Sequence, residues 1–276
     1  MLVKPEFIDD FYDVFTQIGK HDEEELEQLG FQSDKNISLD SDALSCLRFF
    51  PNATNLILRP GCINEEHLHY LYNAPIKRLK LDYYSDLPDK YAVDLSKFSS
   101  LSCVFSRTQF NYRNANKSMN LTTLIVQEWC SCDLQELEND QITSLKILSG
   151  KLKTLKGIGH LYRLRSLSLS HQRALMDVSD LANCRALESL EIDSCNKLDM
   201  NEIPGFSQLK NLVIEGRQTI KNCDFFLRFP QLERLILGVR VLEGDISYFL
   251  NLKHCSLITE CRYYTHKNVD LPKDRL

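Results

Sequence analysis

The chain has 276 residues, of which 43% are hydrophobic, and carries a formal net charge of −5 at pH 7. No segment approaches the roughly 18 consecutive apolar residues that a membrane-spanning helix requires, which excludes such a helix and argues against a membrane partner. The acidic balance disfavours a nucleic-acid partner, because a surface that binds nucleic acid must neutralise phosphates with basic side chains.

The first residues and the cysteines together indicate a compartment. The stretch Met1–Asp10 has no apolar core and turns acidic at once, so it is not predicted to be a signal peptide. Ten cysteines in a long chain of this kind are expected to be thiols, because disulfides persist mainly in oxidising compartments. We therefore expect a cytoplasmic protein.

Residues 1–46 are predicted to form an N-terminal helical cap. Ile8, Phe11, Phe15 and Ile18 follow one another at intervals of three, four and three residues, which places them on one face of a helix. Such a helix can cover the open end of a hydrophobic core.

Residues 47–258 carry a repeat of the form Leu-x-x-Leu-x-Leu with a period of about 22 residues. Leu164, Leu167 and Leu169 form one clear copy. The middle apolar positions of the successive copies are Leu56, Leu79, Leu101, Leu124, Leu145, Leu167, Leu190, Leu212, Leu235 and Cys255.

The repeat predicts a stack of about ten coils. Its last two apolar positions lie two residues apart and so share one face of a β-strand, and stacked strands form a parallel sheet over a continuous apolar interior. Between strands, residues 64–71 open with Asn and two acids and predict a short helix, and residues 177–183 predict a single helical turn. Residues 259–276 lack the repeat and are expected to form a short cap or a frayed tail, all within one structural domain.

These residues resemble the leucine-rich repeat family, in the short repeat class seen in internalins and phosphatase regulators. The resemblance covers 47–258 and implies an α/β solenoid, with a curved parallel sheet on the concave face and short helices or 3-10 turns on the convex face. The family places Asn or Cys five residues after the middle leucine, where the side chain bonds the loop backbone, and Cys195 fits this position. The residues that do not fit it are Gly61, Tyr84, Trp129, Gly150, Gln172, Arg217 and Arg240.

No catalytic or metal-binding motif stands out in the chain. It lacks a phosphate-binding loop, a G-x-S-x-G elbow and an H-E-x-x-H helix, so we expect neither an enzyme nor a cofactor. Cys130 and Cys132 suggest a metal site, but no second Cys or His pair completes it. His67 and His69 point apart on the predicted helix, so no metal is expected.

The residue between the last two apolar positions of each repeat is predicted to face outward on the concave side. Together with the columns beside it, this column makes the concave face basic toward the N-terminal end and acidic toward the C-terminal end, which suits a protein partner of complementary charge. Lys80, Lys146, Glu191 and the neighbouring Glu215 are the candidate contacts. A merely solvated strand face is the alternative.

Large aromatic residues follow three of the predicted strands and are expected to share one rim of the solenoid. Trp, Tyr and Arg are favoured anchors at interfaces, so the rim is a second candidate binding surface. Packing of the rings on one another is the alternative. The residues are Tyr83, Tyr84, Phe105, Arg107, Phe110, Tyr112 and Trp129.

The sequence thus favours a non-enzymatic module that binds a protein. By analogy with small acidic repeat proteins, the most specific hypothesis is an inhibitor, such as a bacterial immunity protein that neutralises a toxin. A regulatory or adaptor subunit of a phosphatase or a ubiquitin ligase is the alternative, and an enzyme with an unrecognised site is the third.

Overall fold

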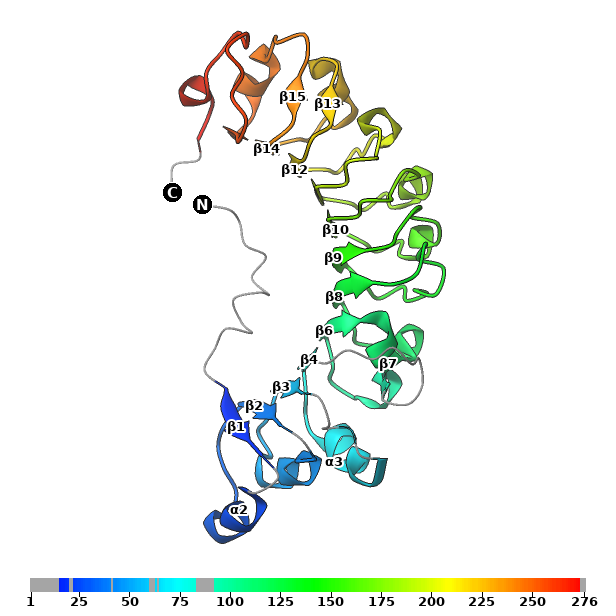
Figure 1. The fold of residues 1–276 in the computed structure, drawn as a ribbon, viewed down its shortest axis with the longest axis vertical. Helices are drawn as coiled ribbons and strands as arrows, with labels where there is room; N and C mark the ends of the chain where they lie inside the picture. Colours follow the sequence, from blue (N-terminus) through cyan, green and yellow to red (C-terminus); the bar gives the residue numbers. More distant parts are fainter. Residues whose placement is uncertain are drawn as a thin grey trace. The chain divides into compact units, whose positions relative to one another are not determined.

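The computed structural model describes residues 15–19, 22–40, 42–59, 63, 65–82 and 92–273. The chain divides into two compact units, Met1–Leu121 and Thr122–Leu276, and each is described by itself. Every strand pair recorded in the described residues of either unit is parallel, as the repeat predicts. Figure 1 labels the strands and helices of each unit and colours them along the sequence. No helix in the described part of the chain is long and apolar enough to cross a membrane.

The first unit contains a sheet of parallel strands in the order β1-β2-β3-β4-β6. The strands are β1 (Thr16–Ile18), β2 (Asn36–Leu39), β3 (Asn55–Leu58), β4 (Arg78–Leu81) and β6 (Cys103–Thr108). The return segments contain α2 (Glu23–Leu29), η3 (Leu44–Phe49), η4 (Glu65–His67), α3 (Leu68–Asn73), η5 (Leu95–Lys97), η6 (Gln109–Asn111) and η7 (Ala115–Lys117). A small second sheet pairs β5 (Val93–Asp94) with β7 (Tyr112–Arg113).

The predicted helix at the N-terminus is wrong where the structure describes it. Ile8 and Phe11 lie outside the described residues, whereas Thr16–Ile18 is a strand whose Ile18 pairs with Leu39. The backbone hydrogen bonds of this pairing, together with the burial of Ile18, favour the extended chain over the helix. Strand β2 in turn pairs in register with β3, so the sheet begins before residue 47.

The third predicted copy of the repeat is displaced by three residues. Leu79 of β4 pairs with Val104, and not with Leu101 as the sequence predicted. Leu101 occupies the first apolar position of its copy, and Ser106 takes the third, where its hydroxyl donates to the carbonyl of Thr108 at 2.7 Å. The outward residue of this strand is therefore Phe105 and not Ser102.

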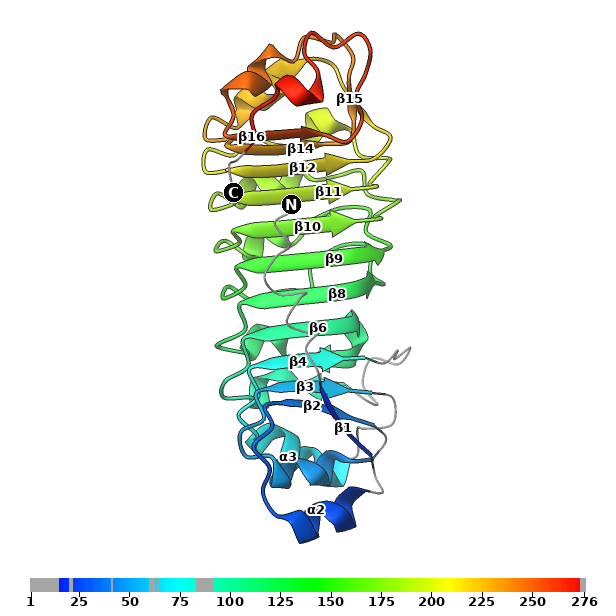
Figure 2. The same ribbon diagram turned by 90° about the vertical axis from the view of Figure 1, so that its left-hand side faces the viewer.

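The larger sheet of the second unit contains seven parallel strands among its described residues, in the order β8-β9-β10-β11-β12-β14-β16. Figure 2 shows them side by side. They are β8 (Thr123–Trp129), β9 (Ser144–Gly150), β10 (Ser166–Ser170), β11 (Ser189–Asp193), β12 (Asn211–Glu215), β14 (Arg234–Leu237) and β16 (His254–Leu257). Their registers confirm the predicted middle positions, which form one buried row: Leu124, Leu145, Leu167, Leu190, Leu212, Leu235 and Cys255.

The return segments of the second unit are mostly short 3-10 turns, as a coil of about 22 residues requires. They are η8 (Ile158–His160), η9 (Ser179–Asn183), η10 (Met200–Glu202), η11 (Cys223–Arg228) and η12 (Ser247–Asn251). A short sheet of β13 (Thr219–Ile220) and β15 (Arg240–Val241) also lies among them. The helix predicted at 64–71 and the turn predicted at 177–183 are confirmed as η4 with α3 and as η9.

The C-terminal residues cap the last strand of the second unit. The amide of Cys255 donates to the carbonyl of Pro272 at 2.8 Å. The Asn268 side chain, in η13 (Asn268–Asp270), accepts from the Leu257 amide at 3.0 Å and donates to its carbonyl at 3.2 Å. Residues 259–276 were expected to form either a short cap or a frayed tail. The described part, 259–273, forms a cap that supplies hydrogen-bond partners to the outer edge of β16.

Candidate functional site

The second unit presents a row of outward side chains along its sheet. On each strand the residue between two buried apolar positions points away from the core, and adjacent strands hold these residues in register. We call this surface the strand face of the second unit. Its central row is Ile125, Lys146, Ser168, Glu191, Val213, Ile236 and Ser256.

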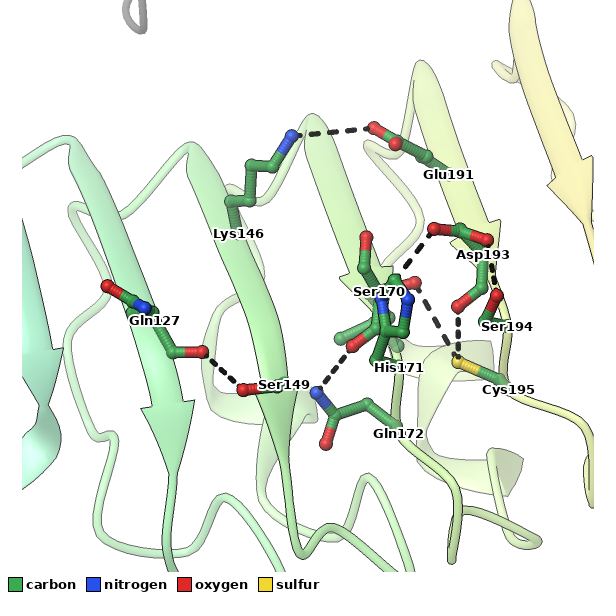
Figure 3. A network of polar contacts seen from close by, with 11 residues as sticks. Gln127, Lys146, Ser149, Ser170, His171, Gln172, Glu191, Asp193, Ser194 and Cys195 are labelled. Carbon is green, nitrogen blue, oxygen red and sulfur yellow. Dashed lines mark hydrogen bonds and ion pairs between the residues drawn. The ribbon is translucent and has the colours of Figure 1, made fainter.

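An ion pair spans one strand of this face. Lys146 on β9 and Glu191 on β11 are both register partners of Ser168, which lies between them on β10. The Lys146 Nζ atom nevertheless approaches the Glu191 Oε2 atom to 3.9 Å, across β10 (Figure 3). The lysine side chain is only 14% exposed, whereas that of Glu191 is 34% exposed.

Two further carboxylates lie beside Glu191. Asp193 ends β11 and Glu215 ends β12, and the two residues are register partners. Burial raises the pKa of Glu215, and the nearby charges of Asp193 and Glu191 raise it further. The backbone of Gly238 lies against this side chain, because a Cβ atom there would come within 3.2 Å of the Glu215 Cγ. We call Glu191, Asp193 and Glu215 the acidic cluster.

The nearest basic groups neutralise this cluster only in part. The Nδ1 atom of His171, whose side chain is 55% exposed, lies 3.8 Å from the Oδ2 atom of Asp193. Ser194 donates its hydroxyl to the other oxygen of Asp193 at 2.8 Å. Lys146 supplies one full positive charge against three carboxylates, so the carboxylates of the cluster outnumber the basic groups beside them.

No protein-family model and no curated protein sequence matches this chain. Among solved structures it is similar to an internalin (inlF) from Listeria monocytogenes, with a TM-score of 0.52 and 17% identity over 83% of this chain and 77% of that one. The chain has a leucine-rich repeat fold.

Two other leucine-rich repeat structures are similar over much of this chain but are considerably longer. The first is TLR13 in its ssRNA13 complex, which is 18% identical to this chain with a TM-score of 0.53. The similarity covers 82% of this chain and 38% of that one. The second is the mouse RP105/MD-1 complex, with 18% identity, coverage of 87% and 53%, and a TM-score of 0.53. At such identities the similarity establishes the fold alone.

The leucine-rich repeat family has an inward Asn or Cys five residues after the middle leucine. In this chain, more side chains at that position bond the loop backbone than the sequence suggested. The Cys195 thiol lies inside the loop as predicted, 3.5 Å from the carbonyl of Asp193 and 3.7 Å from that of Leu169. Burial raises its pKa to about 11, so the thiol stays protonated. Gln172 was predicted not to fit, but its amide donates to the Ser170 carbonyl at 2.8 Å inside the preceding coil.

These inward side chains fix the loops that carry the charged groups. His171 and Ser194, one residue before Gln172 and Cys195, both adopt left-handed backbone conformations, with φ of 52° and 54°. Each also donates its amide to the next strand, to the carbonyls of Asp193 and Glu215 at 2.9 Å. The strand ends that position the acidic cluster are therefore held by main-chain bonds.

The predicted aromatic rim is divided between the two units. In the second unit, Trp129 is 2% exposed and its Nε1 atom donates to the Asp133 carbonyl at 2.8 Å, so its ring packs inside the coil. In the first unit, Tyr112 is buried and Phe110 is half-buried, while Tyr83 and Tyr84 lie outside the described residues.

The remaining predicted contacts of the first unit form pairs with neighbouring strands. The Arg107 Nε atom donates to the Asp82 Oδ1 atom at 2.8 Å. Lys80 lies on the outward side of β4, with its Nζ atom 5.2 Å from the centre of the Phe105 ring. The sequence predicted Phe105 in the rim after the strand and not on the strand, because it placed the third repeat three residues too early.

Proposed function

We propose that this leucine-rich repeat chain is a non-enzymatic module that binds a protein on the strand face of its second unit. The observation that carries the proposal is the acidic cluster: three carboxylates converge on an otherwise ordinary sheet face and are only partly neutralised. Mixed charge of this kind favours specific and rapid association with a complementary protein. The RP105/MD-1 structure is a complex, which agrees with a binding role for this fold.

Two other classes of function fit these residues less well. The TLR13 structure contains single-stranded RNA, but carboxylates repel phosphates, so Glu191, Asp193 and Glu215 oppose that role here. A cysteine nucleophile needs a thiolate, whereas burial raises the pKa of Cys184 and of Cys195 to about 11.

Our narrower proposal is that the chain inhibits a toxin. The acidic cluster is its support, because an inhibitor of a toxin with a basic active surface would present carboxylates to it. The regulatory or adaptor subunit of a phosphatase or a ubiquitin ligase stays a prediction from the repeat class, and no contact described above favours it.

The binding proposal is tested by comparing capture on three immobilised proteins. The wild type should retain a protein in a stoichiometric complex, and an Asp193→Lys/Glu215→Lys variant should lose it. A Glu202→Lys/Glu243→Lys variant, changed by the same charge in exposed return segments, should retain it. Equal capture by all three, or retention of nucleic acid instead of protein, would contradict the proposal.

The narrower proposal needs a growth assay. A gene for the captured protein, expressed alone, should arrest growth, and co-expression of this chain should restore it. Rescue should fail with Asp193→Lys/Glu215→Lys and persist with Glu202→Lys/Glu243→Lys. A captured protein that is harmless when expressed alone would refute the toxin hypothesis while leaving the binding module intact.

A further inference from the structure

We propose that Lys146 occupies the place of a basic side chain of the protein partner. In the complex, a lysine or arginine of the partner displaces Lys146 from Glu191 and lies among Glu191, Asp193, Glu215 and the hydroxyl of Ser168. This inference rests on the proposed binding function and adds to it the chemistry of the partner and the identity of an internal competitor.

The ion pair between Lys146 and Glu191 is long. Charge-assisted N–H···O bonds are typically about 2.7–2.9 Å long, and the Arg165–Glu188 pair of the same unit is 2.6 Å long. Lys146 reaches Glu191 only to 3.9 Å, because its side chain must cross β10 to do so. The contact is therefore loose, and little attraction is lost when another cation replaces it.

The acidic cluster also carries an excess of negative charge. Three carboxylates face one ammonium group, and burial together with the charges of Asp193 and Glu191 raises the pKa of Glu215, so its ionisation is less favourable than in water. A further cation would relieve this repulsion, and the half-buried surroundings screen its attraction less than water does. A flexible lysine or a forked arginine side chain, extended from a docked protein, has the required reach and charge.

Ser168 offers the incoming side chain a hydroxyl group. This residue is 7% exposed, and its buried Oγ atom has no hydrogen-bond partner among the described residues. It lies beneath the path of the Lys146 side chain, between the two ends of the ion pair. Once Lys146 moves aside, the hydroxyl can accept a hydrogen bond from an incoming ammonium or guanidinium group, which its present surroundings do not provide.

The proposal is tested with the whole protein and a defined probe. Isothermal titration calorimetry would measure binding of a lysine heptapeptide, with the same peptide acetylated on every side chain as the uncharged control. The wild type should bind the charged peptide only. Asp193→Asn and Glu215→Gln should each weaken binding about tenfold, as loss of a partly buried charge contact does. Ser168→Ala should weaken it several-fold.

Lys146 gives the most specific outcome. Replacing it by Met keeps an unbranched side chain of nearly the same length and removes the competing ammonium, so Lys146→Met should bind the charged peptide several-fold more tightly than the wild type. Lys151→Met is the matched control, because it removes the same charge from an exposed residue just after β9, and it should differ much less. Circular dichroism would confirm that each variant is folded.

Three results would overturn the proposal. The first is that the wild type does not bind the charged peptide. The second is that Lys146→Met binds it no more tightly than the wild type. The third is that Glu202→Gln weakens binding as much as Asp193→Asn and Glu215→Gln do, which would indicate diffuse charge attraction only. These results are distinguishable from failure of the proposed function. If a captured protein binds Lys146→Met and Asp193→Asn like the wild type, the module stands and this inference fails. If the wild type holds no protein, the function itself fails.

Discussion

Leu190 illustrates what a single repeat leucine contributes to stability. It is fully buried on β11, between its register partners Leu167 and Leu212 on the adjacent strands. Leu190→Ala should lower the free energy of unfolding by about 2–5 kcal/mol, because it leaves a cavity in a packed row. Urea unfolding followed by circular dichroism would measure the loss.

The matched control for this prediction is Leu227→Ala. Leu227 lies in the same unit but is 64% exposed, so its truncation should change the unfolding free energy by less than about 0.5 kcal/mol. Similar losses for the two variants would mean that Leu190 is not part of the packed core.

Glu215 should make stability fall as the pH rises. Its pKa is raised above the ordinary value of 4.5, so the folded protein binds this proton more tightly than the unfolded chain does. The stabilisation from protonated Glu215 is therefore present below pH 4.5 and lost as the pH rises through the raised pKa. Glu215→Gln stays uncharged, so it should be more stable than the wild type at neutral pH.

The difference between Glu215→Gln and the wild type should shrink in acid, where both side chains are uncharged. Thermal unfolding across the range from acidic to neutral pH would show this convergence. Glu202→Gln is the control, since this exposed carboxylate lies in a return segment away from the acidic cluster. A Glu215→Gln protein that is less stable than the wild type at neutral pH would contradict the prediction.

Single residues also mark the limit of the sequence-based predictions. Repeat spacing placed Lys146, Ser168 and Glu191 on one face, because alternation along a strand fixes the side to which each residue points. Spacing carries no information on side-chain conformation, so it could not predict that Lys146 crosses β10. For the same reason the sequence did not predict that Gln172, one methylene longer than Asn, turns inward to the loop carbonyl.

Among the elements, the cap on β16 provides a test of edge protection. Asn268 bonds both the amide and the carbonyl of Leu257, as a neighbouring strand would. Asn268→Ala should destabilise the protein by about 1–3 kcal/mol, because it removes both partners of a largely buried residue. It should also promote self-association, since an open strand edge can pair with another chain.

Urea unfolding and light scattering would measure the two effects of Asn268→Ala separately. Asn251→Ala is the matched control, because Asn251 is exposed at the end of η12 and should affect neither quantity. A destabilised Asn268→Ala protein that stays monomeric would show that the remaining backbone bond from Cys255 to Pro272 is enough to cover the edge.

The elements that the sequence failed to predict have identifiable causes. In the third copy, Leu101 and Cys103 are spaced like the last two apolar positions of a repeat. The sequence therefore predicted the middle position of this copy three residues too early. The true pair is Val104 and Ser106, and a serine in an apolar position gives no signal in the pattern. Strand β2 was missed because Ile37 precedes its register partner Leu56 by a shorter interval than the repeat period.

For the molecule as a whole, the repeat predicted the regular unit well and the irregular one poorly. In the second unit every middle position from Leu124 to Cys255 has the predicted register. The first unit varies the length of its coils, since the register partners Ile37 and Leu56 are closer in sequence than the register partners Leu79 and Val104. In coils of constant length, the leucine spacing fixes which residues pair on neighbouring strands. Where the return segments vary in length, several strand registers fit the same spacing, so the sequence alone does not distinguish them.

The net charge of −5 leads to a prediction about salt. Raising the ionic strength from about 0.01 M to about 0.1 M shortens the screening length from roughly 30 Å to roughly 10 Å. Binding of the lysine heptapeptide should weaken several-fold over this range, while the melting temperature, set mainly by apolar burial, should change little. Calorimetric titration and thermal unfolding in the same buffers would measure both, and salt-independent binding would argue against charge recognition.

Trp129 is the one tryptophan of the chain, and its position turns the protein's fluorescence into a local signal. The indole is almost fully enclosed in the second unit and bonded to the Asp133 carbonyl, so its emission is that of a shielded ring and shifts to longer wavelength when that unit opens. Circular dichroism averages over the backbone of both units. The two optical signals, recorded on one unfolding curve, therefore separate the opening of the second unit from that of the first without any introduced label.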